Sequence, residues 1–396
     1  NPILNIAQSL PHFAYMIPVV VFIGVGPKAG AIVTIIFSVP PMIRMTLLGL
    51  KKVPEEVIEA GKKLKVVSLG SVGVDSVDVD VATRLGIPVT NVANACATGA
   101  TAFRDAWMTI KAGVYDTVLA VGVEQMGKGL LGGGGGVSPE GLVGSYTMPA
   151  MFAHIGMEHS KRYGTTFAQF AQVSVKNHHH STLNPKSMYR VETPLEEVMG
   201  AEMIAWPLTK LMCSVNVDGS AAAVLMSEKK VRERGLMDRA VRIRASEMSS
   251  NPFEDRQMAM PDFSGATRVA AANAYEQAGI GPEEVNLVEL HDCFATAELV
   301  HYENLGLCAF GDAGKLIDDG TTALGGRVPV NVSGGLLSKG HPLGATGIAN
   351  IYEVSTHLRG RAGERQVEGA RIGLTHVVGG GPGMGTACAI HVLEKV

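Results

Sequence analysis

The order strand, turn, helix, strand occurs twice in this chain, and this repetition restricts the fold more than any other feature of the sequence. In the first copy, a strand ends in a tight turn at Cys96, which is followed by a helix over about 99–112 and a strand over 117–123. Apolar residues recur at helical spacing in this helix, and Gly113 stands where a C-terminal glycine is expected.

The second copy carries its reactive residue at the same place. A strand over 328–332 leads to a polar turn around His341, then to a helix over about 344–358 and a strand over 371–378. The sequences Cys-Ala-Thr-Gly-Ala-Thr, from Cys96, and His-Pro-Leu-Gly-Ala-Thr-Gly, from His341, occupy equivalent positions. Each copy therefore places one reactive side chain just before a helix.

A reactive side chain at this position has a physical use. A helix N-terminus carries partial positive charge and unpaired N–H groups, so we expect it to lower the pKa of the Cys96 thiol. The small residues Ala97, Gly99 and Ala100 would let a thioester approach closely. A buried structural thiol is the alternative for Cys96 and a simple turn residue is the alternative for His341, but the paired arrangement favours a reactive role for both.

Three further segments matter. In EEVNLVELHDCFATAELV, His291 and Cys293 open a third strand-to-helix turn, where residues two apart on extended backbone share a face. The run 215–228 predicts a turn into a strand of small residues. Near the C-terminus, the glycines 379–381 offer backbone N–H groups to an oxyanion, with a plain hairpin turn as the alternative.

Two conspicuous clusters are discounted as sites. His178, His179 and His180 resemble a metal-binding tract, but no Cys or acid stands nearby at ligand spacing, so we expect a solvated loop. The glycine run 132–136 lacks the Lys-Ser/Thr that completes a P-loop, and we expect a flexible connection. The sequence therefore predicts no metal site.

The composition excludes several classes of protein. Acidic residues number 37 and basic residues 34, so the formal net charge of −3 gives no support for nucleic-acid binding, which usually shows as a basic surplus. Hydrophobic residues make up 46% and charged residues 18%, which excludes wholesale disorder. The five cysteines form no CxxC pair and fit a reducing compartment best, so we expect a cytoplasmic protein.

The N-terminal region differs from the rest of the chain. No acidic residue precedes Glu55, and the apolar runs 13–25 and 29–39 are each shorter than the roughly 18–20 residues of a membrane helix, which leaves a buried core segment as one interpretation. Residues 1–61, with SLPHFAYMIPVVVFIGVGPKAG and VPEEVIEAG, resemble a membrane permease of a glycine-betaine-type ABC transporter. Membrane contact is expected only if 12–50 act as an anchor.

Residues 64–92 change character again. The segment LKVVSLGSVGVDSVDVDVATRLGIPVTNV predicts a strand, a turn, a helix and a strand, and it resembles the GVGVD region of a D-2-hydroxyacid dehydrogenase. No GxGxxG turn between a strand and a helix follows it, so we assign no dehydrogenase activity. The segment is expected to serve as a generic β-α-β piece.

The remainder, about three quarters of the chain from roughly residue 86, resembles a thiolase of the sterol-carrier-protein-2 type. The motifs NACATG, DGSAAAVLMSE, HDCF, NVSGGLLSKGHPLGATG and GGGPGMGTACAIHVLEK stand in the order of that family. An ordinary thiolase has an Asn-Glu-type motif in place of HDCF and a second cysteine before the terminal glycines, where this chain has Val378. In the sterol-carrier type, the HDCF cysteine takes over that duty.

This resemblance implies a role for each matching residue. Cys96 would be the acyl-accepting nucleophile, His341 would take its proton, and Cys293 would be the acid/base at the α-carbon. His291 would contribute to an oxyanion site with a water, and the N–H groups of Cys96 and Gly380 would form a second one.

The substrates implied are acyl-CoA and CoA, with no further cofactor. Ser333 and Gly334 would contact CoA.

The implied fold is α/β, with duplicated β-α-β-α-β halves stacked as α-β-α-β-α layers and an inserted loop domain. Because foreign segments occupy the start, we expect the N-terminal half to be incomplete, with an unpaired sheet edge. The domains implied are a foreign permease-like segment over 1–62, an N-terminal core half over 63–126 and 207–235, a loop domain over CoA at 127–206, and a C-terminal core half over 236–396.

The leading functional hypothesis is a CoA-thioester acyltransferase, of the acetyl-CoA acyltransferase or acetyltransferase type, that is a homodimer or tetramer. A related retro-aldol lyase acting on a steroid side-chain CoA ester is one alternative. An inactive chimeric thiolase-like protein is a second, and a membrane transporter fragment based on 1–61 is a third.

Overall fold

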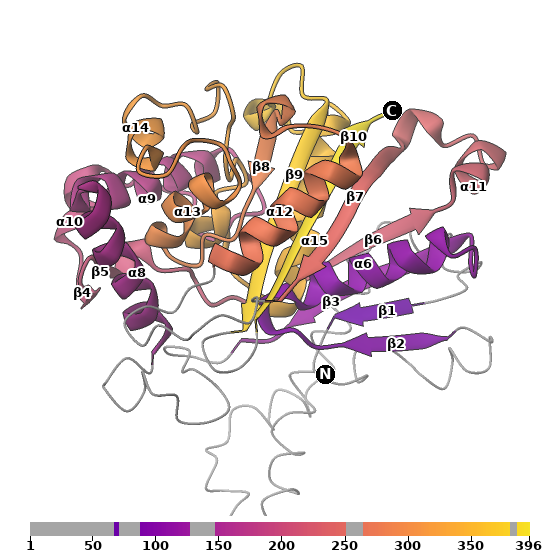
Figure 1. Cartoon of the computed structure of the whole chain (residues 1–396), viewed down its shortest axis with the longest axis horizontal. Coiled ribbons are helices and arrows are strands. Elements are labelled where there is room, and N and C mark those ends of the chain that lie inside the picture. Colours follow the sequence, from indigo (N-terminus) through magenta and orange to yellow (C-terminus); the bar gives the residue numbers. More distant parts are fainter. Residues whose placement is uncertain (1–66, 71–87, 127–146, 251–263, 381–385) are drawn as a thin grey trace, which may run out of the picture. The chain divides into compact units, whose positions relative to one another are not determined.

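The structure is a computed structural model that describes residues 67–70, 88–126, 147–250, 264–380 and 386–396 (Figure 1). All of these residues belong to one compact unit, formed by Leu64–Val72 and Ala82–Val396. The permease-like segment, the proposed anchor over 12–50 and the glycine run 132–136 lie outside the described residues. None of the described helices combines the length and the apolar character needed to cross a membrane.

The first sheet contains the strands that lead to and from Cys96. Its order is β2-β1-β3-β6, and β1 is parallel to both of its neighbours, whereas β6 runs antiparallel to β3. Strand β1 comes from the dehydrogenase-like segment, so that segment supplies an inner strand of the sheet. The bounds are β1 Val67–Gly70, β2 Val89–Val92, β3 Thr117–Glu124 and β6 Gly219–Met226.

The second sheet has the order β7-β10-β9-β8, with β10 antiparallel to both neighbours and β8 parallel to β9. The short helix α11, Glu228–Glu233, lies in the chain between the last strand of the first sheet and the first strand of the second. The bounds are β7 Val241–Ser249, β8 Leu287–Glu289, β9 Ile372–Gly380 and β10 Thr386–Lys395.

The strand predicted over 328–332 is wrong, because only a single bridge, Val288 to Val330, forms there. Asn331 has a φ of 55°, a left-handed conformation that interrupts extended backbone. Its side-chain Oδ1 accepts the Leu290 N–H at 2.9 Å, so a side chain takes the place of a backbone ladder partner.

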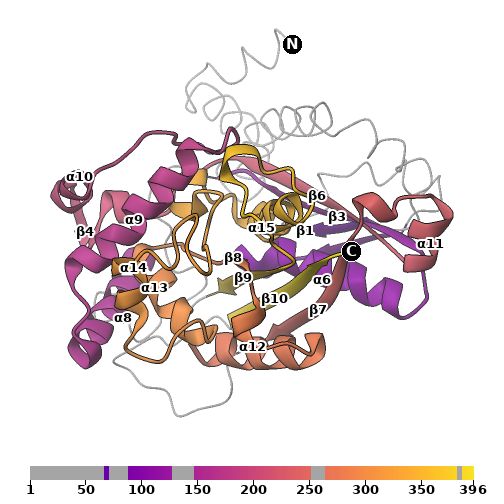
Figure 2. The same ribbon diagram turned by 90° about the horizontal axis from the view of Figure 1, so that it is seen from above.

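Helices α6, Thr98–Lys111, and α15, Leu343–Leu358, lie between the two sheets and pack against each other (Figure 2). Both begin within one residue of the predicted start. Glycines allow their close approach: a Cβ on Gly99 would lie 2.6 Å from the Gly344 carbonyl oxygen, and one on Gly347 would overlap the Ala100 backbone. The close crossing brings the two helix N-termini together, and with them the segments that precede each helix.

Helix α12, Ser264–Ala278, covers the other face of the second sheet by packing on β7 and β10. The described residues thus form four of the five predicted layers: α12, the second sheet, the α6–α15 pair and the first sheet. A shared hydrophobic cluster joins the middle helices to both sheets, including Phe103, Val118, Leu287, Ile348 and Leu393.

A helical lobe lies beside the second sheet (Figure 1). Thr166 and Gln169 form a capping box at the start of α9, which explains why the helix begins there. Within the predicted loop domain the structure describes three helices and β4, which pairs with β5 just beyond residue 206. The lobe contains α8 Met148–Tyr163, α9 Phe167–Thr182, α10 Leu195–Gly200, β4 Met203–Ala205, β5 Leu208–Thr209, α13 Ala295–Asn304 and α14 Ala313–Asp318.

The solvated loop predicted at the three consecutive histidines is wrong. They lie in α9, where His178 and His180 are 3% and 1% exposed. His180 donates from Nδ1 to the Asn331 carbonyl at 3.0 Å and accepts the Leu324 N–H at Nε2. Only His179 faces solvent, beside Glu192. The tract is therefore mostly core, because two of its three side chains are buried and His180 is held by backbone groups of Asn331 and Leu324.

Candidate functional site

Cys96 lies in a sharp turn between β2 and α6. The preceding residue, Ala95, has a φ of 48°, which is costly for a side-chain-bearing residue. Asn94 secures the turn: its N–H donates to Thr98 Oγ1 at 2.8 Å and its Nδ2 donates to Thr101 Oγ1 at 2.9 Å. The turn is therefore built by hydrogen bonds from Asn94 to the start of the helix.

The end of β9 presses on the same turn. A Cβ on Gly379 would collide with the Asn94 carbonyl oxygen and the Ala97 nitrogen, so only glycine fits there. Gly380, the next residue, has a φ of 94° and ends the strand. The backbone at Gly379 and Gly380 thus reaches the turn that holds Cys96. The sequence predicts an oxyanion-binding pair of N–H groups, from Cys96 and Gly380, at this place.

His341 follows a π-helical turn over Gly335–Lys339 and precedes α15. Its ring Nδ1 lies 2.8 Å from Thr346 Oγ1, while the Thr346 hydroxyl donates to the Pro342 carbonyl at 3.0 Å. Because that hydroxyl has given its hydrogen to Pro342, it must accept from His341. The hydrogen of the neutral His341 ring is therefore on Nδ1, and Nε2 carries a free lone pair.

His291 has the opposite tautomer. The backbone N–H of Val378 donates to its Nδ1 at 3.1 Å, so the hydrogen of the neutral ring is on Nε2. That Nε2 lies 3.4 Å from His341 Nε2, which makes His291 the donor and His341 the acceptor of this contact. The His291 backbone N–H is itself held by His376 Nδ1 at 3.4 Å.

The structure brings three of the predicted residues together from distant parts of the chain. The Cys96 sulfur and ring nitrogens of His291 and His341 all lie within 4.8 Å of one another. A thiol, a nitrogen lone pair and an N–H donor therefore meet at one point. This set can remove a proton from sulfur and hydrogen-bond a developing oxyanion.

The same three groups could in principle hold a metal ion, but the chemistry of the donor set does not fit one. A metal needs a ring nitrogen with a free lone pair. In His291 the Nδ1 lone pair accepts the Val378 N–H and Nε2 carries the hydrogen, so neither nitrogen is free to bind a cation.

The environment of the site keeps its groups neutral. Burial raises the pKa of the Cys96 thiol to about 12; the nearby Glu124 adds to this and a backbone hydrogen bond opposes it. Burial, His291 and Lys339 hold the pKa of His341 well below its usual range, and burial and His301 lower the pKa of His291 to about 3. Burial of the Cys96 thiol thus acts against the lowering of its pKa that the helix N-terminus predicts.

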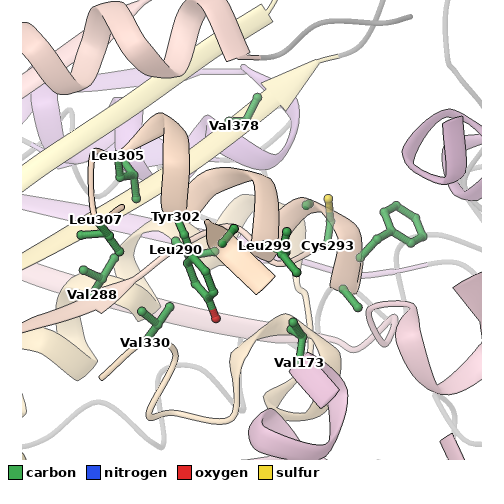
Figure 3. Close-up of a cluster of buried hydrophobic side chains, with 14 of the residues drawn as sticks. Val173, Val288, Leu290, Cys293, Leu299, Tyr302, Leu305, Leu307, Val330 and Val378 are labelled. Atoms are coloured by element: carbon green, nitrogen blue, oxygen red, sulfur yellow. The ribbon is translucent and has the colours of Figure 1, made fainter. Parts of the chain in front are cut away.

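Cys293 lies at the entrance to α13, and Figure 3 shows it beside Leu299 of that helix. Its side chain is 7% exposed, and its carbonyl accepts the Ser214 N–H at 2.9 Å. Burial raises the pKa of this thiol well above its usual value, and Cys96 and Asp292 raise it further. Cys293 is therefore neutral at rest, and a negative charge on Cys96 would disfavour its thiolate further.

Ser333 and Gly334 lie deeper than the prediction of CoA contacts implies. Both are buried, and Ser333 donates from N–H and Oγ to Glu289 at 2.9 and 2.6 Å. Its carbonyl accepts from Asn184 and Ser187 of the helical lobe. The contact with CoA stays a prediction that these bonds do not support.

Sequence reasoning missed the groups that orient the site. Thr346 fixes the His341 tautomer, the Val378 N–H fixes that of His291, and Glu124 accepts the Gly344 N–H at 3.0 Å at the start of α15. A threonine in the first turn of the helix after His341 was a visible signal. The Val378 contribution comes from backbone, so no residue type could have indicated it.

Two family models match the chain. The model described as thiolase C-terminal domain-like matches residues 250–395, which include His291, Cys293 and His341. The model described as D-isomer specific 2-hydroxyacid dehydrogenase, catalytic domain, matches residues 42–298. The second match begins in the N-terminal region and contains the dehydrogenase-like segment.

Curated relatives favour the thiolase model over the dehydrogenase model. Sterol carrier protein 2 of Bos taurus is 43% identical over 310 residues, which are 74% of this chain and 57% of that protein. The acetyl-CoA acetyltransferase of Methanothermobacter thermautotrophicus is 39% identical over 338 residues, 81% of this chain and 84% of that enzyme. The chain thus spans little more than half the length of the first relative and most of the second.

A solved structure gives the same fold. The Ltp2-ChsH2(DUF35) aldolase superposes with a TM-score of 0.67 and 23% identity, over 84% of this chain and 87% of that one. This likeness concerns the fold alone.

Proposed function

Because this chain belongs to the sterol-carrier-protein-2 type of the thiolase family, we propose that it is a CoA-thioester acyltransferase that cleaves or forms a 3-ketoacyl-CoA through an acyl group on Cys96. One observation carries the proposal: the thiol, the His341 lone pair and the His291 N–H meet within 4.8 Å. The relatives supply the CoA thioester as the substrate class.

The first step is attack by Cys96. Its sulfur adds to the ketone carbon of the 3-ketoacyl-CoA while its proton moves to the lone pair of His341 Nε2, which gives up the hydrogen bond that it accepts from His291 Nε2–H at rest. A thiol with a pKa near 12 is a poor nucleophile until this transfer occurs, so His341 is needed for reactivity. The N–H groups of Cys96 and Gly380 would hold the oxygen that becomes negative.

The second step breaks the bond between C2 and C3. The acyl group stays on Cys96, and the electrons of the bond form the enolate of acetyl-CoA. The His291 Nε2–H is directed to the site as a donor for that enolate oxygen, a contribution of about 3–4 kcal/mol for a preorganised donor. Cys293 gives its proton to the α-carbon, which yields acetyl-CoA and a Cys293 thiolate.

The last step regenerates the enzyme. The thiol of CoA attacks the acyl group on Cys96 and passes its proton to Cys293, and the Cys96 sulfur leaves and recovers the proton held by His341. Atoms balance to one 3-ketoacyl-CoA and one CoA consumed, and two acyl-CoA molecules formed. Neutral thiols and neutral imidazoles at rest suit this cycle, since each group must be able to hold or release one proton.

The test is CoA-dependent thiolysis of a 3-ketoacyl-CoA. We expect Cys96→Ser to abolish turnover and to abolish the acetyl adduct that mass spectrometry finds after incubation with acetyl-CoA. Cys293→Ala should retain that adduct but lose deuterium exchange at the α-carbon of acetyl-CoA. Cys308→Ser is the matched control, because Cys308 is also partly buried with a pKa raised to about 12, but it lies in the helical lobe beyond α13.

Two results would overturn the proposal. Full turnover in Cys96→Ser would show that Cys96 is not the nucleophile. A wild-type protein that is inactive and forms no adduct would favour the inactive chimeric thiolase-like alternative. The retained pair of cysteines and His341 distinguishes the proposal from the retro-aldol alternative, because a carbon–carbon lyase needs no acyl-cysteine.

We also propose a cytoplasmic location, on the cysteine usage, and a homodimer or tetramer, on the family resemblance. Light scattering of the purified full chain tests the assembly, and a monomer at micromolar concentration would contradict it.

A further inference from the structure

A buried carboxylate stands between the two HDCF residues that the mechanism uses. Asp292 is 0% exposed and accepts three hydrogen bonds. The N–H groups of Leu336 and Leu337 donate to its Oδ1 and Oδ2 at 2.8 and 3.3 Å, and Asn177 Nδ2 donates to Oδ2 at 2.9 Å. The three donors come from the π-helical turn before His341 and from α9 of the helical lobe.

The fit between Asp292 and the turn is tight. A Cβ on Gly335 would overlap Asp292 Oδ2, and Gly335 has a φ of 60°, so the chain allows only glycine at this point. The Asp292 carboxylate therefore contacts the backbone of the turn at Gly335 and accepts hydrogen bonds from the next two N–H groups, those of Leu336 and Leu337.

Asn177 is in turn held by a fully buried charged cluster. Its Nδ2 also donates to Glu298 Oε2 at 2.7 Å, and its Oδ1 accepts from Lys176 Nζ at 2.6 Å. Lys176 forms an ion pair with Glu298 at 2.8 Å. The Lys176 ammonium thus pairs with one buried carboxylate, Glu298, and is linked to Asp292 only through the Asn177 side chain. A buried ion pair of this kind is costly to desolvate, and its hydrogen bonds fix the geometry of each member.

We propose that Asp292 is a positioning residue that keeps the His291–Cys293 turn in register with the turn leading to His341, and that Asn177 makes this register depend on helix α9. The purpose of this alignment, which is acyl transfer at Cys96, rests on the proposed function. Loss of one acceptor would leave buried N–H groups unpaired, and a displacement of about 1 Å at a reacting group can cost about 100-fold in rate.

The test is the rate at which iodoacetamide alkylates Cys96 at pH 7, followed by mass spectrometry of the full chain. This rate needs His341 to take the thiol proton, but it needs no substrate. Asp292→Asn keeps the shape of the side chain and replaces an accepting oxygen by an NH₂ group that faces donors. We expect alkylation of Cys96 to slow about tenfold in Asp292→Asn. His341→Ala gives the rate without the proton acceptor and serves as the lower reference.

Glu303→Gln is the matched control. Glu303 is 5% exposed, accepts the N–H groups of Gly311 and Ala313 at 2.8 and 3.3 Å, and pairs with His159 of α8 at 3.1 Å. It therefore has the same kind of buried bonds, but they lie within the helical lobe and none of them is with the turn before His341. We expect its alkylation rate to stay within about twofold of wild type.

Asn177→Ala removes only one of the three donors and should slow alkylation in the same direction by less. If circular dichroism shows that Asp292→Asn does not fold, the alkylation rate of Cys96 in Asn177→Ala decides whether the inference holds. A folded variant that alkylates as fast as wild type, or a control that slows as much as Asp292→Asn, would overturn the inference. If wild type shows no thiolysis while Asp292→Asn still slows alkylation, the positioning role stands and the proposed function fails.

Discussion

The two halves of the molecule share one plan and put it to different chemical use. Strands β1 and β8 are parallel to β3 and β9, and β6 and β10 run antiparallel to those same neighbours. Helices α6 and α15 follow the reactive turns in each half. Strand β7 extends the second sheet beyond β10, whereas among the described residues no strand pairs with the corresponding edge of β6.

The chemical difference lies in how each half fixes its reactive group. In the first half, hydrogen bonds from Asn94 build a turn around Cys96 and leave the thiol itself to react. In the second half, Thr346 and the Val378 N–H set the tautomers of His341 and His291. A nucleophile must be free, while an acid/base pair must be oriented, so the duplicated scaffold has become asymmetric at its centre.

Removal of His341 should have the largest effect, because it deprives the first half of its proton acceptor. We expect His341→Ala to lower kcat/KM for thiolysis by about 10³-fold, since a positioned general base contributes about 10²–10⁴. His179→Ala, at an exposed histidine of α9, is the control and should retain activity. A His341→Ala variant within about tenfold of wild type would show that Cys96 is activated without the second half.

His291 should matter less, because it donates to an oxygen rather than moving a proton. We expect His291→Ala to lower kcat by about 10²-fold with little change in KM, the pattern for a donor that acts mainly in the transition state. Steady-state kinetics with a 3-ketoacyl-CoA would measure this. An effect on KM alone would move His291 from the reacting centre to substrate binding.

The glycine contact between α6 and α15 tests whether the halves must touch. Gly347→Ala would push a methyl group into the Ala100 backbone, and we expect a loss of about 1–3 kcal/mol in the free energy of unfolding. Gly200→Ala is the control, because a Cβ there meets nothing within 4 Å. Urea unfolding of the two variants measures the difference, and equal stability would show that the crossing can relax.

Part of this comparison was visible in the sequence. The ends of α6 and α15 were predicted within one residue, because both helices have regular apolar spacing and begin after polar turns. The strand over 328–332 was not, since the left-handed Asn331 interrupts it and nothing in its residue type requires that conformation. The α9 histidines were misjudged because a short polar run does not show which helix face is buried.

The sequence indicated which residues form the candidate site, but neither their mutual distances nor their protonation. Cys96, His291, Cys293 and His341 stand in recognisable motifs, yet their mutual distances depend on how the halves pack. The expected low pKa of Cys96 followed from the helix alone. The structure adds desolvation of the Cys96 thiol by burial, which no local pattern of residues records.

The smallest predicted effect concerns His391 of β10, which meets Phe103 of α6 edge-on at 4.9 Å, where the two halves touch. Burial, with Arg104 next, lowers the pKa of His391 to about 3 in the folded state. An unfolded histidine has a pKa near 6.5, so the unfolded chain alone binds this proton as the pH falls through that value. The stability contribution is therefore present above about pH 6.5 and is lost progressively toward pH 3.

His391→Gln keeps a polar side chain near Ser246 but cannot titrate. Between pH 7 and pH 5.5 we expect the free energy of unfolding to fall by about 1 kcal/mol less in this variant than in wild type, since each unit of pH below 6.5 costs about 1.4 kcal/mol for one buried neutral histidine. Urea unfolding at the two pH values measures the difference, with the exposed His179→Gln as the control. Equal pH dependence in His391→Gln and wild type would mean that water reaches this ring, and that the boundary between the halves is open to protons at the contact of α6 with β10.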